Sequence, residues 1–215
     1  MGSPDVEAWR TATRPLIIAC AALTNDLRAV LRASNLDQLF DVAYLPANLH
    51  FRPELIIPQL EPVIADAVAA GRSVFIGYAD CGTGGLLDAM LARYPGVQRL
   101  PGAHCYQFFV GETVFAQMQE AELGTFYLTD FLVKHFDALV WGSLGLERAP
   151  ELRDMYFANY TRVMYLSQTV NPELIVAARR AADRLGLAFE HTHVGRGGLA
   201  QPVNEWSISL RKAAA

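Results

Sequence analysis

Short, almost wholly apolar runs alternate with longer amphipathic stretches in the first half of the chain. The runs "RPLIIAC" (residues 14–20), "QLFDVAYLP" (38–46) and "SVFIGYAD" (73–80) predict three strands. The third is the richest in β-branched and aromatic residues and is therefore expected at the centre of a sheet. Between the first two runs, one helical face collects Leu23, Leu27, Val30 and Leu31. This alternation is typical of an α/β domain built on a largely parallel sheet.

A proline-rich helix is predicted between the second and third strands, over residues 53–71. Pro53 suits a first helical turn, Pro58 and Pro62 indicate an irregular start, and Gly71 suits the end. If the three strands are parallel neighbours, the loops after them share one edge of the sheet, where ligands of such folds collect.

The middle of the chain is more aromatic and has helix-like spacing. Helices are predicted over residues 113–123, 126–141 and 149–166, with a fourth over 171–186 that Asn171 caps. An aromatic stripe in the third of these is interpreted as core or helix interface: Tyr156, Phe157, Tyr160 and Tyr165. Residues 187–196 and "EWSISL" (205–210) predict two further strands.

Together these elements predict one three-layer α/β domain of Rossmann-like or flavodoxin-like type. Its largely parallel sheet has helices on both faces and a helical middle insertion. The domain is expected over residues 14–211, with flexible tails at 1–13 and 212–215.

Charge and cysteine content narrow the class of protein. The 215 residues are 52% hydrophobic with a formal net charge of -4, which gives no clustered basic surface for nucleic acid. Neither a secretory signal nor a membrane-spanning run is found, so a cytoplasmic protein without membrane or nucleic-acid partners is expected. Three cysteines in a reducing compartment argue against a disulfide framework.

The turn "ADCGTGGLL" (79–87) is the most prominent candidate for chemistry. Glycines let the backbone approach a ligand, and the amides of residues 83–87 are expected to point toward Cys81, favouring its thiolate. Cys81 is therefore a candidate nucleophile or metal ligand. The four residues Gly82, Thr83, Gly84 and Gly85, with His50, are candidates for cofactor binding. A phosphate cradle is the weakest interpretation, because the P-loop lysine is missing, and a structural turn is the plain alternative.

The three cysteines Cys20, Cys81 and Cys105 all fall at predicted strand ends or adjoining loops. Three thiols completed by His50, His104 or water suit tetrahedral zinc, and three thiolates suit an iron–sulfur cluster with one open iron. Because no Cys-x-x-Cys pair is present, this metal site depends on convergence in three dimensions.

Other polar residues have two interpretations each. Asp80 either activates a partner beside Cys81 or caps the turn, and His104 is either an acid/base group or an ordinary polar residue. His191 and His193 would lie on one face of a strand with metal-like spacing, although exposed alternation on an edge strand is the favoured account.

Six stretches resemble the DUF 1638 family from about Arg14 to Leu199: "IACAAL", "LPANLHFRPE", "ADCGTGGLLD", "LPGAHCYQFFVG", "GTFYLTDFLVKHFD" and "PELRDMYFANYTRVMYLSQT". The resemblance implies a prokaryotic, single-domain, cytoplasmic protein, often encoded beside corrinoid-dependent methyltransferases and their reductive activators. It brings no established activity. The family's pattern is matched at Cys20, His50, Asp80, Cys81, Gly82, Gly84, Gly85, His104 and Cys105. Ala21 departs from it, since relatives usually have Gly there.

Three hypotheses follow. The first is a zinc- or iron–sulfur-binding protein of corrinoid-linked one-carbon metabolism, with its site at Cys20, Cys81 and Cys105. The second is a metal-free enzyme in which Cys81 attacks a small-molecule electrophile and His104 handles protons. The third is a non-catalytic adaptor that binds a corrinoid protein or a methyltransferase through the aromatic region around Tyr156, Phe157 and Tyr160.

Overall fold

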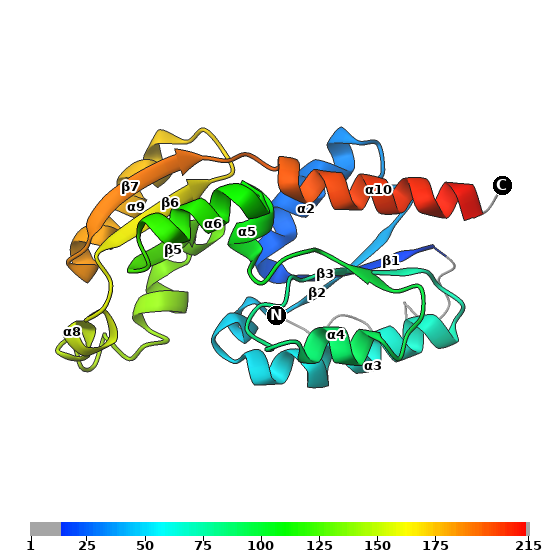
Figure 1. The fold of residues 1–215 in the computed structure, drawn as a ribbon, viewed down its shortest axis with the longest axis horizontal. Coiled ribbons are helices and arrows are strands. Elements are labelled where there is room, and N and C mark those ends of the chain that lie inside the picture. The colour runs from blue at the N-terminus through cyan, green and yellow to red at the C-terminus, as the bar shows by residue number, and fades with distance from the viewer. Residues whose placement is uncertain (1–13, 214–215) are drawn as a thin grey trace. The chain divides into compact units, whose positions relative to one another are not determined.

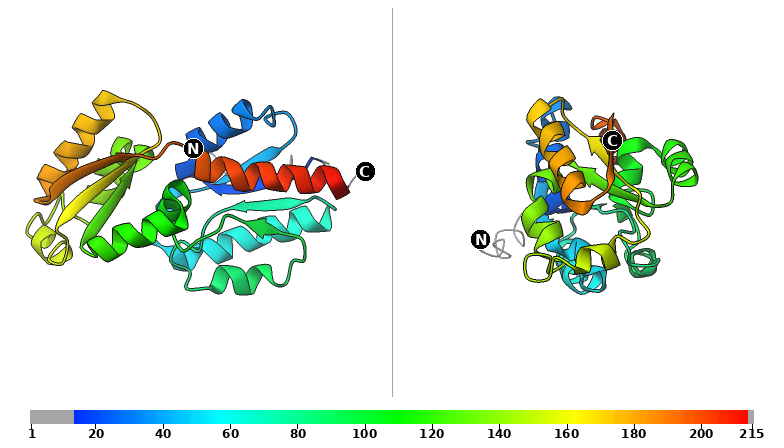
Figure 2. Two further views of the ribbon diagram at one scale, coloured as in Figure 1. Left: turned by 45° about the horizontal axis from the view of Figure 1, so that its top comes forward. Right: turned by 90° about the vertical axis from the view of Figure 1, so that its left-hand side faces the viewer.

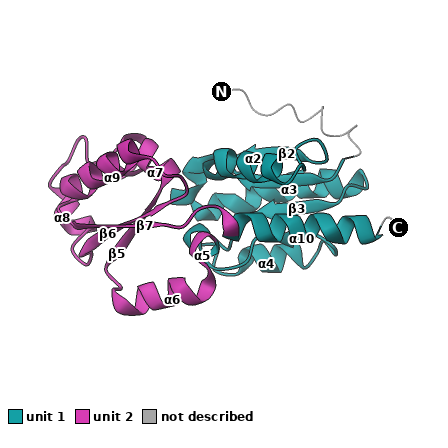
Figure 3. Cartoon of the chain, turned by 90° about the horizontal axis from the view of Figure 1, so that it is seen from above, with its two compact units in different colours: residues 1–108, 198–215 teal, residues 109–197 magenta. Residues whose placement is uncertain are grey.

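A computed structural model describes residues 14–213, which form two compact units. The first unit contains the described residues up to Phe108 and those from Gly198 onward, and the second contains Phe109–Gly197 (Figure 3). Each unit has its own all-parallel sheet. The parallel α/β class predicted from the sequence is confirmed, but two sheets are present where one was expected.

The first sheet has the strand order β2-β1-β3-β4. Its strands are β1 (Leu16–Cys20), β2 (Asp41–Leu45), β3 (Val74–Gly77) and the short β4 (Gln98–Arg99). Leu16 pairs with Asp41 on one side and with Val74 on the other, so β1 and β3 are the inner strands. The strands predicted over 14–20, 38–46 and 73–80 are therefore present as parallel neighbours.

Helices cover both faces of the first sheet (Figures 1 and 2). One face carries α2 (Thr24–Ala33) and α10 (Gly197–Ala213), and the other carries α3 (Ile56–Ala69) and α4 (Leu86–Leu91). Short helical turns precede α2 and α3, namely η1 (Ala21–Leu23), η2 (Ala47–Phe51) and η3 (Pro53–Leu55). The irregular, proline-led start predicted for α3 is thus η3. The short helix α5 (Cys105–Val110) begins in the first unit and ends in the second.

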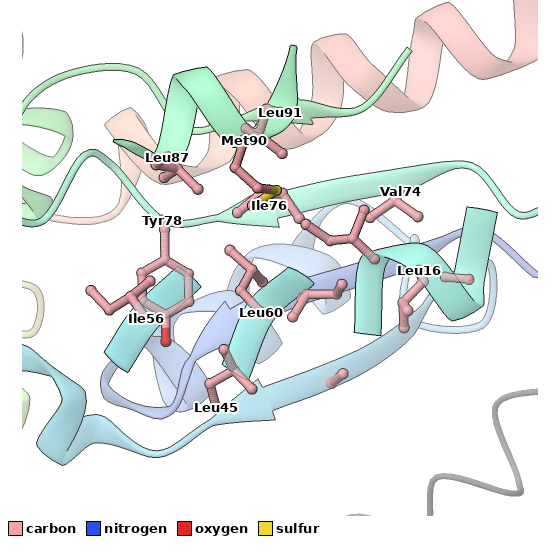
Figure 4. Close-up of a cluster of buried hydrophobic side chains, with 14 of the residues drawn as sticks. Leu16, Leu45, Ile56, Leu60, Val74, Ile76, Tyr78, Leu87, Met90 and Leu91 are labelled. Atoms are coloured by element: carbon pink, nitrogen blue, oxygen red, sulfur yellow. The ribbon is translucent and has the colours of Figure 1, made fainter. Parts of the chain in front are cut away.

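The core of the first unit fills the space between the sheet, α3 and α4 (Figure 4). Ile76 of β3, Leu60 of α3 and Leu87 of α4 are each 0% exposed. On the opposite face, the Trp206 ring of α10 lies 5.0 Å from Phe40 and 5.3 Å from Phe75 between ring centroids. The strand predicted for "EWSISL" is wrong, because this stretch belongs to α10 and buries Trp206 at helical spacing.

The second sheet has the order β5-β6-β7, with β5 (Thr125–Thr129), β6 (Arg162–Ser167) and β7 (Ala188–His193). The helical elements of this unit are α6 (Glu112–Ala121), α7 (Asp130–Lys134), the π-helix η4 (Asp137–Trp141), α8 (Leu152–Tyr156) and α9 (Pro172–Leu185). In Figure 3, α7 and α9 lie over one face of this sheet and α6 over the other. Asn171 caps α9, as predicted, by accepting hydrogen bonds from Glu173 and Leu174.

The middle of the chain contains two strands that the sequence analysis took for helix. Residues 125–129 form β5 and residues 162–167 form β6, so Tyr165 is a strand residue with 0% exposure. The continuous apolar run in β6 suits a central strand covered on both faces, which periodicity alone does not distinguish from a buried helix. Phe157 is buried, whereas Tyr156 and Tyr160 are exposed.

The ends of the described chain also qualify the predicted domain limits. Residues 1–13, expected to be a flexible tail, lie outside the described residues, as do 214 and 215. Residues 212 and 213 belong to α10. Across residues 14–213, no helix has both the length and the apolar character needed to span a bilayer.

Candidate functional site at the carboxyl edge of the first sheet

The three cysteines come from three neighbouring segments of the first unit. Cys20 ends β1, Cys81 lies in the turn after β3, and Cys105 begins α5. The turn is held to the loop before α5 by two backbone hydrogen bonds, from the Cys81 amide to the Ala103 carbonyl (2.8 Å) and from the Asp80 amide to the Gly102 carbonyl (3.0 Å). The structure therefore brings these segments together as the parallel strand order predicted.

Electrostatic coupling shows that the three partly exposed thiols are close neighbours. Burial raises the pKa of Cys81 to about 12, and the Cys20 thiol adds to this rise. Burial also raises the pKa of Cys105, with contributions from Cys81 and Cys20, and burial raises that of Cys20. The expected low-pKa thiolate at Cys81 is therefore wrong for the metal-free protein, because desolvation, the Cys20 thiol and Asp80 outweigh the backbone hydrogen bonds to its sulfur.

The Asp80 carboxylate accepts hydrogen bonds from two of the five amides that were expected to face Cys81. Gly84 and Gly85 each donate a backbone hydrogen bond to it at 2.9 Å, and the Thr83 hydroxyl donates at 2.5 Å. Partial burial raises the pKa of Asp80, but the hydrogen bonds from Thr83, Gly85 and Gly84 bring it below its usual value. Asp80 thus caps the turn, which was one of its two predicted roles. The assignment of the glycines to a cofactor stays a prediction.

Cys81 itself has an unusual backbone conformation, with φ of 51°. A side chain in this left-handed region is disfavoured for residues other than glycine, and such residues often occur at functional sites. Gly82 follows with φ of 84°, and a Cβ there would meet the Pro53 ring at 3.4 Å. Cys81 is therefore the first residue of the turn with a positive φ, a conformation that favours glycine, and it nevertheless carries a thiol.

His50 and His104 form a second pair at this edge. Both side chains are exposed, yet the surrounding protein lowers the pKa of His50 by desolvation, and the charge of nearby His104 lowers it further. The Tyr106 ring lies edge-on to His50 at 6.4 Å between centroids. The two histidines that were predicted to complete a metal site therefore lie near each other, and His104 is next to Cys105 in the chain.

Tyr78 is a site residue that the sequence analysis missed. It is 3% exposed, and its hydroxyl is buried beside Cys20 without a hydrogen-bond partner of normal geometry within residues 14–213. Burial and the Cys20 thiol both raise the pKa of Tyr78. Its signal in the sequence is a tyrosine two residues beyond Ile76 on one face of the strand, which carries the hydroxyl to the sheet edge.

The thiols do not form a ready-made metal site. Among the residues that the structure describes, no group of three or more Cys, His, Asp or Glu side chains is positioned to hold a metal ion. The donor chemistry still suits a thiophilic ion, because three neighbouring thiols have raised pKa values and the cation near Cys81, Arg99, is already paired with Asp88.

A hollow of about 420 Å³ adjoins the glycine-rich turn on its α3 and α4 side. Thr83 and Leu86 from the turn, Pro53 and Ile57 near the start of α3, and Arg93 line it together with other residues. Its lining is mostly apolar, with Glu54 and Arg93 as charged groups, so it offers space for a small molecule beside the turn.

Comparison with known proteins assigns the chain to a family. Neither the curated proteins nor the solved structures yield a match. A family model with the description "Protein of unknown function (DUF1638)" matches residues 44–202, well over half of the chain. The match includes Cys81 and Cys105, whereas Cys20 precedes it. The chain therefore belongs to the DUF1638 family.

Proposed function

We propose that Cys20, Cys81 and Cys105 bind a thiophilic metal centre, either zinc or an iron–sulfur cluster. The observation that carries this proposal is the meeting of three thiols from the end of β1, the turn after β3 and the start of α5. Cys20 raises the pKa of Cys81, and both of them raise the pKa of Cys105. A divalent cation would place positive charge directly on the sulfur atoms and would convert the thiols to thiolates.

The electrostatics favour a metal centre over the metal-free enzyme. Because burial raises its pKa far above 7, the Cys81 thiol is protonated at neutral pH. A free cysteine nucleophile normally has a lowered pKa, set by a basic neighbour or a helix N-terminus. Here the turn's Gly84 and Gly85 amides are bound to Asp80. His104 does not lower the pKa of Cys81. The charged neighbours that act on this thiol, Cys20 and Asp80, both raise its pKa.

The residues around the thiols suggest how such a site is completed. His50, His104 or water would be the fourth ligand, and the three thiols would have to turn toward a common point. Bound zinc or a cluster would provide a stabilised thiolate or an open coordination position. The Tyr78 hydroxyl would orient the Cys20 sulfur by hydrogen bonding, and Asp80 would keep the turn in shape.

The family resemblance supports a place for this site in corrinoid-linked one-carbon metabolism. In that setting, a small molecule that accepts or donates a methyl group would bind beside the turn that carries Cys81, and a corrinoid protein or methyltransferase would be the partner. The hollow lined by Thr83 and Ile57 is the proposed space for that molecule.

Anaerobic purification with elemental analysis and an absorption spectrum tests the metal centre. We expect zinc or iron near one site per chain, and loss of most of the metal in Cys20→Ser, Cys81→Ser and Cys105→Ser. Ser143→Ala, in the second unit, is the matched control and should keep the metal. Metal-free wild type that also fails to take up added zinc or a reconstituted cluster would contradict the proposal, as would folded cysteine variants that retain full metal.

An adaptor function is the second candidate, because α8 and the loop after it expose large apolar side chains. Met155 is 62% exposed, Tyr156 42% and Tyr160 38%. Apolar surface of this kind is a common mark of protein–protein contact. Co-purification with a corrinoid protein that is lost in Tyr156→Ser/Tyr160→Ser, together with an empty thiol site, would favour this candidate over the metal centre.

A further inference from the structure

Ser167, His191 and His193 meet at the carboxyl edge of the second sheet. Ser167 ends β6, and its register partner His193 ends β7, the neighbouring edge strand (Figure 1). The Ser167 Oγ lies 3.0 Å from His191 Nε2 and 3.1 Å from His193 Nδ1. Two imidazole nitrogens from one strand therefore face a single point.

The surrounding residues hold this arrangement in place. The His191 ring stacks on Tyr165 with 5.1 Å between centroids and 24° between planes. The Tyr165 hydroxyl donates a 2.7 Å hydrogen bond to buried Asp130, which also accepts from the Gln168 amide (3.0 Å) and the Thr169 hydroxyl (2.5 Å). The orientation of His191 is thus fixed before any ligand arrives.

The end of β7 is fixed in the same way. The Ser167 carbonyl accepts hydrogen bonds from the amides of Val194 (2.9 Å) and Gly195 (3.2 Å). These bonds hold the chain just after His193 against the end of β6. Both imidazoles are exposed, whereas Ser167 beneath them is 1% exposed.

Hydrogen-bond accounting restricts the tautomers of the two imidazoles. The Ser167 hydroxyl has one proton and can donate it to only one of the two nitrogens, so the other imidazole must be in the tautomer that donates. A metal ion above the hydroxyl would instead accept both nitrogen lone pairs at once. Neutral imidazole is the commonest protein ligand for such ions.

We propose that His191 and His193 bind a divalent transition metal ion such as zinc, with Ser167 beneath the ion. Two imidazoles of a His-x-His pair on one strand face supply two ligands, and solvent or a bound anion fills the positions that remain open. The site is in the second unit and is independent of the thiol site. The site binds the metal ion alone. An open coordination position on the ion would then accept a carboxylate or a phosphate.

A serine nucleophile is the competing chemistry for the same residues, but the geometry favours metal. Ser167 is buried, whereas His191 and His193 are exposed. The two backbone amides near Ser167, those of Val194 and Gly195, are bound to its own carbonyl and are not free to stabilise an oxyanion.

Zinc titration by calorimetry in a Cys20→Ser/Cys81→Ser/Cys105→Ser chain tests the site without the thiols. We expect one zinc per chain, a loss of affinity of roughly tenfold or more in His191→Gln or His193→Gln, and no binding in the double variant. His135→Gln, which removes an exposed histidine of the same unit, should bind as the parent does. If the thiol-free chain does not fold, the ring resonances of His191 and His193 are followed by NMR in wild type as zinc is added.

Several results would overturn this proposal. They are the absence of zinc binding in the folded thiol-free parent, unchanged affinity in the double histidine variant, or unmoved His191 and His193 resonances in wild type. Covalent labelling of Ser167 by a fluorophosphonate that depends on His191 would assign a serine nucleophile instead.

Discussion

At the residue scale, the thiol of Cys81 occupies a backbone position that suits glycine. Its φ of 51° contrasts with Cys20, which has φ of -66° and ψ of 135° in ordinary extended conformation. A side chain in the left-handed region costs roughly 1–2 kcal/mol that glycine does not incur. The protein therefore retains a thiol at Cys81 at a cost to its stability.

This strain predicts opposite effects of glycine at two cysteines. Cys81→Gly should be more stable than Cys81→Ala by about 1 kcal/mol, because glycine adopts positive φ freely. Cys20→Gly should be less stable than Cys20→Ala by roughly 0.5–1 kcal/mol, because glycine only adds flexibility to a strand. Urea unfolding measures all four, and the same sign at both positions would contradict the strain.

The raised thiol pKa values predict a loss of stability at alkaline pH. Each thiol is protonated in the folded protein at a pH where the unfolded chain, with a pKa near 9, has begun to ionise. The stabilising contribution is therefore complete below about pH 9 and is lost as the pH rises toward about 12. The difference in unfolding free energy between metal-free wild type and the thiol-free chain should shrink over this range. A constant difference would show that the thiols are not desolvated.

At the scale of elements, the turn between β3 and α4 depends on Asp80. Asp80→Asn should destabilise the metal-free protein by roughly 1.5–3 kcal/mol, because the amides of Gly84 and Gly85 lose a charged acceptor. Asp88→Asn removes an exposed ion pair with Arg99 and should cost about 1 kcal/mol or less. Thermal unfolding compares the stability of the two variants. Equal losses of stability would show that the Asp80 hydrogen bonds contribute no more than an exposed ion pair.

β1 and β3 approach each other closely at Gly77. A Cβ there would lie 2.6 Å from the Ala19 Cβ, so Gly77→Ala must push the two inner strands apart. We expect a loss of roughly 1–3 kcal/mol by urea unfolding. Gly84→Ala meets no atom within 4 Å and loses stability through its φ of 63° alone. A neutral Gly77→Ala would show that the strands can separate without cost.

The sequence predicted the first unit better than the second, for a physical reason. β1, β2 and β3 are apolar runs separated by well-marked helices, so their parallel order and the meeting of Cys20 with Cys81 could be inferred. β5 and β6 are aromatic runs next to helices. A buried strand and a buried helix have similar residue composition, so the pattern did not distinguish them. The pKa of Cys81 could not be inferred, because it depends on burial and neighbours that only folding creates.

At the scale of the whole molecule, the second unit is one continuous stretch of chain. It has its own sheet and its own buried residues, such as Tyr165 and Val163. Residues 109–197 expressed alone should therefore fold, with amide NMR shifts of β5, β6 and β7 close to those in the full chain. A spectrum of an unfolded polypeptide would show that the unit needs the rest of the protein.

The first unit, by contrast, is completed by helix α10, which returns to it after the whole second unit. Trp206 of α10 covers Phe40 and Phe75 on one face of the first sheet. During translation, this face therefore stays uncovered until the ribosome has synthesised all of residues 109–197. Until then the newly made amino-terminal half exposes an apolar face, and at that stage the chain is most prone to aggregate.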